Sequence, residues 1–321
     1  MKLRLTALLA AFAAALVAAT TSGGATGPDH VTIAYQPGMG YAPLIIMRAQ
    51  KTLENQYPNT KFDWKVLASG AAVTNGVIAG DIQLGAGGIG PFLLGWAKGV
   101  NWKLIAPMNW GDLWLMAKDP NIKTIADLKG KRVAMPSPTS IQGFVLRKMA
   151  QVKLGDAHAL DAGMVSMDHP DGMQALLTGQ VDAHLTSLPY QMQEKLNGAH
   201  VVARSYQFFG ASSFLGVSAQ QSFYDQNTAF CKQFYADVAN AIKLIKSNPI
   251  KVAHILQDDA GGQPSWRQFK QWMGSPSITY TTRPLGLVRF ANFMFKIGAI
   301  NKMPATWKDL VFPPVYPTKG S

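Results

Sequence analysis

Short apolar runs alternate with segments of helical composition along the chain, and this alternation occurs twice, about one hundred residues apart. Val31 to Tyr35 is an apolar run, followed by a Gly/Pro loop and by a helical segment from Ala42 to Lys51. The same order returns with an apolar run from Arg132 to Met135, a loop, and a helical segment from Ile141 to Val152. Apolar runs of this length, each followed by a helical segment, are typical of α/β proteins.

A second pair of segments recurs at nearly the same offset. Residues 77–84 (VIAGDIQL) and 176–183 (LLTGQVDA) each have the pattern of a helix end, a glycine cap and the start of a strand. Because both repeats share one offset, we expect two α/β lobes of similar design that face each other; chance similarity between α/β units is the alternative. Ligands bind beyond the carboxyl ends of strands in such sheets, so the repeats predict a ligand cleft between the lobes.

Changes in the pattern predict where the chain passes from one lobe to the other. The apolar strand Trp114 to Ala117 ends in a Lys-Asp-Pro sequence, and the strand Phe214 to Ser218 follows a Gly/Ser-rich stretch. We expect lobe 1 at residues 26–116, lobe 2 at 117–215 and a helical return to lobe 1 at 216–321. Two crossings predict a two-strand hinge that lets the lobes close on a ligand. Further helices are expected at 125–130, 228–246, 250–258, 265–273 and 284–300.

The first 25 residues have the pattern of a secretion signal. Lys2 and Arg4 precede the uncharged run Leu5 to Val17, and Val17 and Ala19 offer small residues for cleavage. The run is too short to span a bilayer, which needs about 20 apolar residues. A buried N-terminal helix is the alternative. Since no cysteine follows the cleavage site, we expect a soluble periplasmic protein without a lipid anchor.

Composition and charge exclude several classes of protein. The chain of 321 residues is 48% hydrophobic and only 15% charged, which excludes a disordered chain. Its single cysteine, Cys231, excludes an intramolecular disulfide and a cysteine-based zinc cluster. The net charge of +12 comes mainly from scattered basic residues in the last third, a pattern that favours anions but not nucleic acid. The six histidines do not have the spacing of metal ligands, and no base is paired with a nucleophile in the sequence. We therefore expect no bound metal, no cofactor and no catalytic activity.

Two loops at predicted strand ends carry candidate ligand contacts. Residues 135–142 (MPSPTSIQ) place hydroxyl groups and free N–H groups where a helix starts, and helix N-termini bind anions. Ordinary capping by Ser137, Thr139 or Ser140 is the alternative. Residues 36–41 (QPGMGY) form the equivalent loop of lobe 1, unless the turn serves geometry alone. The candidates in these loops are Gln36, Pro37, Gly38, Tyr41, Ser137, Pro138, Thr139, Ser140, Ile141 and Gln142.

Aromatic and apolar residues near the loops form a second group of candidates. Trp110 ends an apolar segment and would form a cleft wall, while Ser187 and Leu188 follow the second strand of the repeat and would line the lobe 2 side. Core packing is the alternative for each. An aromatic wall suits an organic ligand better than bare nitrate. No Arg or Lys lies in the predicted loops, so recognition of charge would depend on backbone donors.

Several short segments carry a resemblance to a known family. They are residues 125–134 (IADLKGKRVA), 175–183 (ALLTGQVDA), 284–286 (PLG), 290–294 (FANFM) and 304–310 (PATWKDL). Their order and spacing resemble the periplasmic substrate-binding proteins of ABC importers, of the nitrate, sulfonate, taurine and pyrimidine-precursor type. The likeness covers nearly the whole chain after the predicted signal segment.

The resemblance implies a type II periplasmic binding protein fold, in which a ligand is held between two lobes. It implies that loop 135–142 holds the anionic group of the ligand and that the backbone of Gly88, Ile89 and Gly90 faces it. Residues 85–90 (GAGGIG) also match Gly-x-Gly-x-x-Gly, but they do not open the first βαβ unit, so we reject a dinucleotide site.

The resemblance also implies partners and a role. We expect a monomer that captures a small anionic or oxygen-rich organic solute and delivers it to an ABC permease of the inner membrane. An exported enzyme on the same fold and a solute sensor remain alternatives. Related enzymes that make a pyrimidine from their own histidine are cysteine-rich near the site, which this chain is not. The solute itself stays open among sulfonate, nitrate, carboxylate and pyrimidine.

Overall fold

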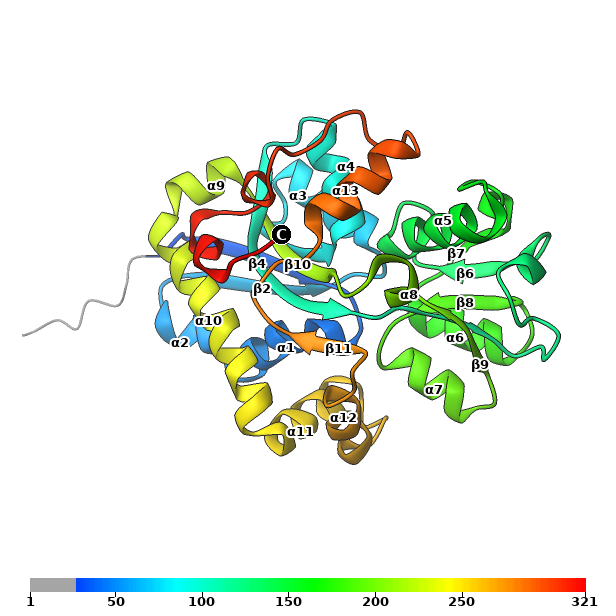
Figure 1. The fold of residues 1–321 in the computed structure, drawn as a ribbon. Coiled ribbons are helices and arrows are strands. Elements are labelled where there is room, and N and C mark those ends of the chain that lie inside the picture. The colour runs from blue at the N-terminus through cyan, green and yellow to red at the C-terminus, as the bar shows by residue number, and fades with distance from the viewer. Residues whose placement is uncertain (1–26) are drawn as a thin grey trace, which may run out of the picture.

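A computed structural model describes residues 27–321, which form two α/β lobes, each built on one sheet (Figure 1). The predicted signal segment lies outside the described residues. Among residues 27–321, no helix combines the length and apolar character that a membrane crossing requires.

The sheet of the first lobe is mixed and has the order β11-β4-β10-β3-β1-β2. Strand β1 runs parallel to β2 and to β3, so the loops that follow these strands leave the sheet at the same edge. Strand β10 is antiparallel to β3 and β4 and comes from the return of the chain. The strands are β1 (His30–Tyr35), β2 (Lys61–Val66), β3 (Leu84–Gly88), β4 (Trp102–Gly111), β10 (Ser213–Gln220) and β11 (Ile278–Tyr280).

The sheet of the second lobe is also mixed, with the order β7-β6-β8-β5-β9. Strand β6 is parallel to β7 and β8, while β5 is antiparallel to β8 and β9. The loops after β6, β7 and β8 therefore meet at one edge, which faces the corresponding edge of the first lobe. The strands are β5 (Trp114–Ala117), β6 (Val133–Met135), β7 (Met164–Ser166), β8 (Ala183–Thr186) and β9 (His200–Arg204).

Helices cover both faces of each sheet. In Figure 1, α3, α4 and α13 lie above the first sheet and α1, α11 and α12 below it, while α5 lies above the second sheet and α6 and α7 below it. The helices of the first lobe are α1 (Ala42–Ala49), α2 (Thr52–Gln56), α3 (Gly70–Ala79), α4 (Ile89–Ala97), α9 (Gln221–Gln226), α10 (Thr228–Ser247), α11 (Pro249–Asp259), α12 (Trp266–Met273) and α13 (Leu287–Lys296). Those of the second are α5 (Ile141–Leu154), α6 (His169–Leu177), α7 (Tyr190–Leu196) and α8 (Tyr206–Phe209).

Two predicted helices differ from the structure. Residues 125–130 form only a 3-10 turn at Ala126–Leu128, because Lys129 leaves helical geometry and Gly130 has a φ of 73°. The helix expected at 284–300 is shorter, since Gly286 adopts a φ of 69° and the helix begins only at Leu287. A left-handed glycine at that position favours a helix boundary.

The chain passes between the lobes twice, in two segments that touch each other. Strand β5 pairs with β8 and β9, so residues 114–116 belong to the second sheet. We therefore propose lobe boundaries at 112–113 and 205–212, in place of the expected 116/117 and 215/216.

Asp112 joins the two crossing segments. Its side chain is 2% exposed and accepts hydrogen bonds from Arg204 Nε at 2.6 Å, the Tyr206 N–H at 3.0 Å and Ser205 Oγ at 3.2 Å. The backbone N–H of Leu113 donates to Ser205 Oγ at 2.9 Å, and the Ser205 N–H donates to the Leu113 carbonyl at 2.8 Å. These bonds fix the position of the two crossing segments relative to each other.

We expect Asp112→Ala to lower the free energy of unfolding by about 3 kcal/mol, because it leaves buried donors without an acceptor. Urea denaturation followed by circular dichroism measures this loss. The matched control is Asp81→Ala, since Asp81 is exposed and should change stability by less than about 0.5 kcal/mol. Equal stability of the two variants would contradict a structural role for Asp112.

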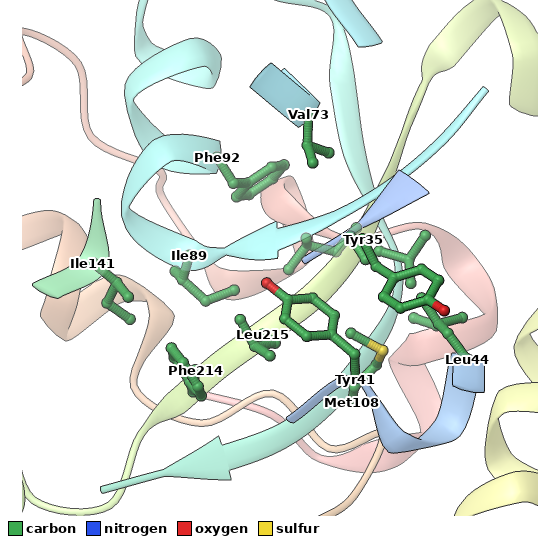
Figure 2. Packing of buried hydrophobic residues seen from close by; sticks show 14 of the residues in the cluster. Tyr35, Tyr41, Leu44, Val73, Ile89, Phe92, Met108, Ile141, Phe214 and Leu215 are labelled. Atoms are coloured by element: carbon green, nitrogen blue, oxygen red, sulfur yellow. The ribbon is translucent and has the colours of Figure 1, made fainter. Parts of the chain in front are cut away.

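Most buried apolar residues form one continuous core that runs through both lobes. Figure 2 shows part of it, where Ile141 of α5 lies beside Ile89 of α4 and Phe214 of β10. Cys231 is buried in this core, and burial raises the pKa of its thiol to about 12, which makes it an unreactive core residue. No group of His, Cys, Asp and Glu within residues 27–321 is arranged to hold a metal ion.

Candidate functional site

Two cavities lie between the lobes, on either side of the loop that follows β1. Pro37 and Gly38 line both of them. The inner cavity measures about 30 Å³ and the outer one about 360 Å³. By this measure a water molecule occupies about 10–15 Å³, so the inner cavity has room for a small group only.

The inner cavity lies where five helices begin. Its lining includes residues at the starts of α3, α4, α5 and α6 and Tyr41, the N-cap of α1. The loops after β1, β6 and β8 and the start of β10 complete it. The lining residues are Gln36, Pro37, Gly38, Gly40, Tyr41, Gly70, Gly88, Pro91, Pro136, Ser140, Ile141, Gln142, His169, Ser187, Phe214 and Leu215. A helix N-terminus carries about half a positive charge and unpaired N–H groups, so this convergence favours an anion.

The donors that the inner cavity offers to an anion come mainly from the backbone at helix starts. None of its described lining residues is an Asp, Glu, Lys or Arg. Helices α1 and α4 begin without a side-chain cap, whereas Ser69, Ser140 and Asp168 cap α3, α5 and α6. Ser140 Oγ accepts from the Gly143 N–H at 3.2 Å. The alternative of ordinary capping therefore applies to Ser140, which lines the cavity as well.

Hydrogen bonds hold the loop of residues 36–41 in place. Gln36 Nε2 donates to the Tyr41 hydroxyl at 2.7 Å, and Asn109 Nδ2 donates to the Gly40 carbonyl at 2.7 Å. The Tyr280 hydroxyl donates to the Met39 carbonyl at 2.8 Å. Burial raises the pKa of Tyr41, so its hydroxyl stays neutral and polar at the edge of the cavity.

The lobes touch each other directly around the inner cavity. The Met39 N–H of the first lobe donates to the Leu188 carbonyl of the second at 3.1 Å. A Cβ on Gly90 would lie 2.9 Å from Phe144 Cδ2 and 3.2 Å from Ile141 Cα, so α4 and α5 meet at the distance that glycine allows. In Figure 2, Ile89 of α4 and Ile141 of α5 lie side by side where these two helices begin. The structure therefore has the lobes closed on a small cavity.

The structure brings nine of the sixteen candidate residues to the inner cavity. They are Gln36, Pro37, Gly38, Tyr41, Gly88, Ser140, Ile141, Gln142 and Ser187. The other seven lie elsewhere. Ile89 and Gly90 pack toward α5. The Ser137 and Thr139 hydroxyls lie 3.2 Å from each other, and the Pro138 carbonyl accepts from Arg147 at 2.8 Å. Leu188 lines a separate small space of about 10 Å³.

Trp110 does not line either cavity. Its indole N–H donates to the Arg283 carbonyl at 2.8 Å, and the Arg283 guanidinium lies 5.9 Å from the ring centre. Side chains alternate along a strand, and on β4 it is the buried Asn109 that points to the loop of Gly40. Trp110 consequently lies on the side opposite to the one a cleft wall requires.

Seven residues that line the inner cavity were not among the candidates: Gly40, Gly70, Pro91, Pro136, His169, Phe214 and Leu215. The signal for His169 was present in Asp168-His169-Pro170. An Asp before a Pro is the pattern of an N-cap and first helical turn, and the Asp168 side chain accepts from the Asp171 N–H at 3.0 Å.

The outer cavity combines apolar walls with polar groups. The Arg48 guanidinium pairs with the Asp259 carboxylate and lies 5.6 Å from the centre of the Tyr35 ring. Partial burial raises the pKa of Asp259, and Arg48 opposes that shift. The Tyr35 hydroxyl is buried and has no hydrogen-bond partner among the described residues. Apolar contact surface comes from Met39, Ile45, Met173, Leu256 and Phe269.

Comparison with known proteins gives the same fold. A model of the NMT1/THI5-like family matches residues 66–252. A protein of Escherichia coli (strain K12) described as an aliphatic sulfonates-binding protein is 26% identical over 225 residues, which is 69% of each chain.

Two solved structures extend the comparison. The alkanesulfonate-binding protein SsuA from Xanthomonas axonopodis pv. citri, bound to MOPS, has a TM-score of 0.73 and 20% identity over 87% of this chain and 96% of its own. The periplasmic nitrate-binding protein NrtA from Synechocystis PCC 6803 has a TM-score of 0.73 and 13% identity over 90% of this chain and 87% of its own.

The expected resemblance to periplasmic binding proteins and the type II fold are thereby confirmed. Each of these named relatives is a binding protein, which agrees with the expectation that this chain is not an enzyme. With a family model that matches more than half of its length, the chain belongs to the NMT1/THI5-like family.

Proposed function

We propose that the protein binds a small aliphatic sulfonate between its lobes in the periplasm and delivers it to an ABC permease of the inner membrane. The observation that carries the proposal is the convergence of five helix N-termini on a cavity without charged side chains. A sulfonate spreads one negative charge over three oxygen atoms, each of which accepts hydrogen bonds. Backbone N–H groups that point from several directions suit such a group.

The two cavities would hold different parts of the solute, its anionic head and its organic body. The inner cavity, at about 30 Å³, takes the anionic head, and the outer cavity, at about 360 Å³, takes the organic body. The apolar walls of the outer cavity favour an alkyl or ring system. The Tyr35 hydroxyl, which has no hydrogen-bond partner within residues 27–321, would provide a hydrogen bond for a polar atom of the solute. Nitrate would fill only the inner part.

Binding and release require that the lobes move apart. The solute would first contact one lobe in the open state, and closure about the two crossing segments would bring the helix N-termini of the other lobe onto it. Closure removes the head from water, which strengthens each hydrogen bond to it. The closed form is the one that the permease would bind.

Titration calorimetry with ethanesulfonate tests the proposal. We expect ethanesulfonate to bind at least about tenfold more tightly than nitrate and than the uncharged ethyl methyl sulfone, because only the sulfonate offers both charge and apolar body. Small-angle scattering should show a smaller radius of gyration with ethanesulfonate than without it. No binding of ethanesulfonate, or equal affinity for the sulfone, would contradict the proposed solute class.

A further inference from the structure

A chain of four hydrogen-bonded side chains leads from the inner cavity into the core of the second lobe. Gln142 Nε2 lies 3.0 Å from His169 Nε2, and His169 Nδ1 lies 3.0 Å from His184 Nε2. His184 Nδ1 lies 2.5 Å from Glu194 Oε1. Gln142 and His169 line the cavity, whereas His184 and Glu194 have no exposed surface.

The chain is electrically neutral at neutral pH. Burial raises the pKa of Glu194 to about 9 and lowers the pKa of His184 to about 3. Burial, with a contribution from His184, holds the pKa of His169 well below its usual range. Glu194 therefore carries a proton, and each imidazole carries one N–H.

A neutral imidazole has one donor and one acceptor nitrogen, so the three hydrogen bonds run in one common direction. The Thr186 hydroxyl also lies 3.4 Å from His169 Nδ1, and because a hydroxyl both donates and accepts, it fits either direction. If Glu194 donates to His184 Nδ1, then His184 Nε2 donates to His169 Nδ1, and His169 Nε2 donates to Gln142. Gln142 must then exchange its two amide atoms by a half-turn, because the structure places Nε2 next to His169. The half-turn, which hardly changes the shape of the side chain, puts the carbonyl oxygen on His169 and the NH₂ group toward the cavity. If His184 donates to Glu194 instead, every bond reverses and the Gln142 oxygen faces the cavity.

The position of the proton on Glu194 selects between the two directions. Glu194 Oε2 is buried without a partner among the described residues, whereas Oε1 lies next to His184 Nδ1. A proton on Oε2 would be a buried donor without an acceptor, which costs about 1–3 kcal/mol. The proton therefore belongs on Oε1, where it is donated to His184.

Close packing holds both rings in this arrangement. A Cβ on Gly172 would lie 2.8 Å from His184 Nε2, so α6 passes directly over that ring. Tyr190 stacks on His169 with ring centres 5.6 Å apart. The Gln142 oxygen, which the structure places away from His169, has no hydrogen bond to any described residue. That position is therefore available to a ligand, and the half-turn of the amide fills it with the NH₂ group.

We propose that Glu194, acting through His184 and His169, is a positioning residue that turns the NH₂ group of Gln142 toward the cavity and thereby selects solutes that accept hydrogen bonds. The nature of the solute rests on the proposed function, but the direction of the hydrogen bonds does not.

The other charged groups around Glu194 have their own partners or lie outside the chain of hydrogen bonds. Strand β5 contributes no ionisable side chain, and on β9 His200 contacts the Ile122 carbonyl while Arg204 pairs with Asp112. Helix α6 contributes Asp168, which caps it, and Asp171 on its first turn; α7 itself contributes Tyr190 and the exposed Lys195. Among the described residues, only His184 is hydrogen-bonded to the side chain of Glu194.

This arrangement links the binding of an anion to a proton. Loss of the Glu194 proton reverses the chain and turns the Gln142 oxygen toward the anion. Affinity for ethanesulfonate is therefore constant up to about pH 8 and falls above pH 9, by up to about tenfold per pH unit. Binding of the anion in turn raises the pKa of Glu194.

Nitrogen-15 NMR of histidine-labelled protein tests the direction without any ligand. We expect His169 and His184 to be protonated on Nε2 at pH 7 and on Nδ1 above about pH 9. Protonation of His184 on Nδ1 at pH 7 would overturn the inference, whether or not a sulfonate binds. The expected tautomers without binding of ethanesulfonate would contradict the proposed function alone.

A second test measures the affinity of Glu194→Gln for ethanesulfonate by calorimetry as a function of pH. An amide donates to His184 Nδ1 as the protonated carboxyl does, so we expect the affinity of wild type at pH 7 and less than a twofold change up to pH 10. Asp237→Asn is the matched control, since Asp237 is a buried carboxyl on α10, its pKa is also raised by burial, and it lies outside both cavities. The control should retain the fall above pH 9. A flat profile for wild type, or the same fall in Glu194→Gln, would overturn the inference.

Discussion

Replacing Gly90 with alanine is expected to weaken ethanesulfonate binding by about 10- to 100-fold while both lobes stay folded. The added Cβ would lie 2.9 Å from Phe144 Cδ2 and within 3.3 Å of the backbone N and Cα of Ile141. Backbone atoms at a helix start have no alternative rotamer, so α4 and α5 would have to separate. The closed form, in which the helix N-termini of both lobes reach the head group, would become rarer.

Calorimetry and small-angle scattering measure this effect together. We expect Gly90→Ala to remain more extended than wild type in the presence of ethanesulfonate and to unfold in urea at nearly the wild-type midpoint. Gly87→Ala is the matched control, because a Cβ on Gly87 of β3 would meet no atom within 4 Å. Wild-type affinity in Gly90→Ala would show that the contact between α4 and α5 does not limit closure.

The substitution Gln142→Glu is expected to weaken ethanesulfonate binding by about 100-fold or more at pH 7. It places a carboxylate in a cavity whose other lining groups carry no formal charge, next to the negative head of the solute. Two like charges about 4 Å apart at a protein surface repel by about 4 kcal/mol. Lowering the pH should restore part of the affinity, because protonation of the new carboxyl removes the repulsion.

Gln142→Met separates the charge from the hydrogen bonds. Methionine has a similar size and no donor, so we expect a loss of only about tenfold, without recovery at low pH. Calorimetry at pH 5 and pH 7 compares the two variants. Equal losses in both would mean that Gln142 acts through its shape and not through its donors.

Most helices and strands could be predicted from the sequence, because the patterns that mark them span only a few residues. The glycine that ends α3 shows this, since Gly80 adopts a φ of 85° at the C-cap, as the repeat predicted. The first repeat was equally informative, because β1 and β6 are each followed by a loop and a helix that begins at the cavity. The start of α13 could not be predicted from the sequence. Pro284 is compatible with a first helical turn, and only the left-handed geometry of Gly286 moves the start of the helix to Leu287.

About half of the candidate site residues were predicted correctly in the same way, because many of them lie where helices begin. Ser140 and Gln142 lie at the cavity because a helix start after a parallel strand points to the open edge of the sheet. Ser137 and Thr139 belong to the same loop, but their hydroxyls lie next to each other instead. A difference of one or two residues in a loop changes the direction of a side chain, and no periodic pattern in the sequence records it.

By itself, the sequence determined the alternation of strands and helices, the duplicated strand–loop–helix units and therefore two lobes with helix N-termini at their facing edges. These follow from apolar periodicity and glycine caps, which act over a few residues. Only the tertiary structure decided how large the cavity is, that Trp110 points away from it, and that His169, His184 and Glu194 form one hydrogen-bonded chain. Such contacts depend on how a strand and two helices pack, and packing is set by the shapes of many residues that are distant in sequence.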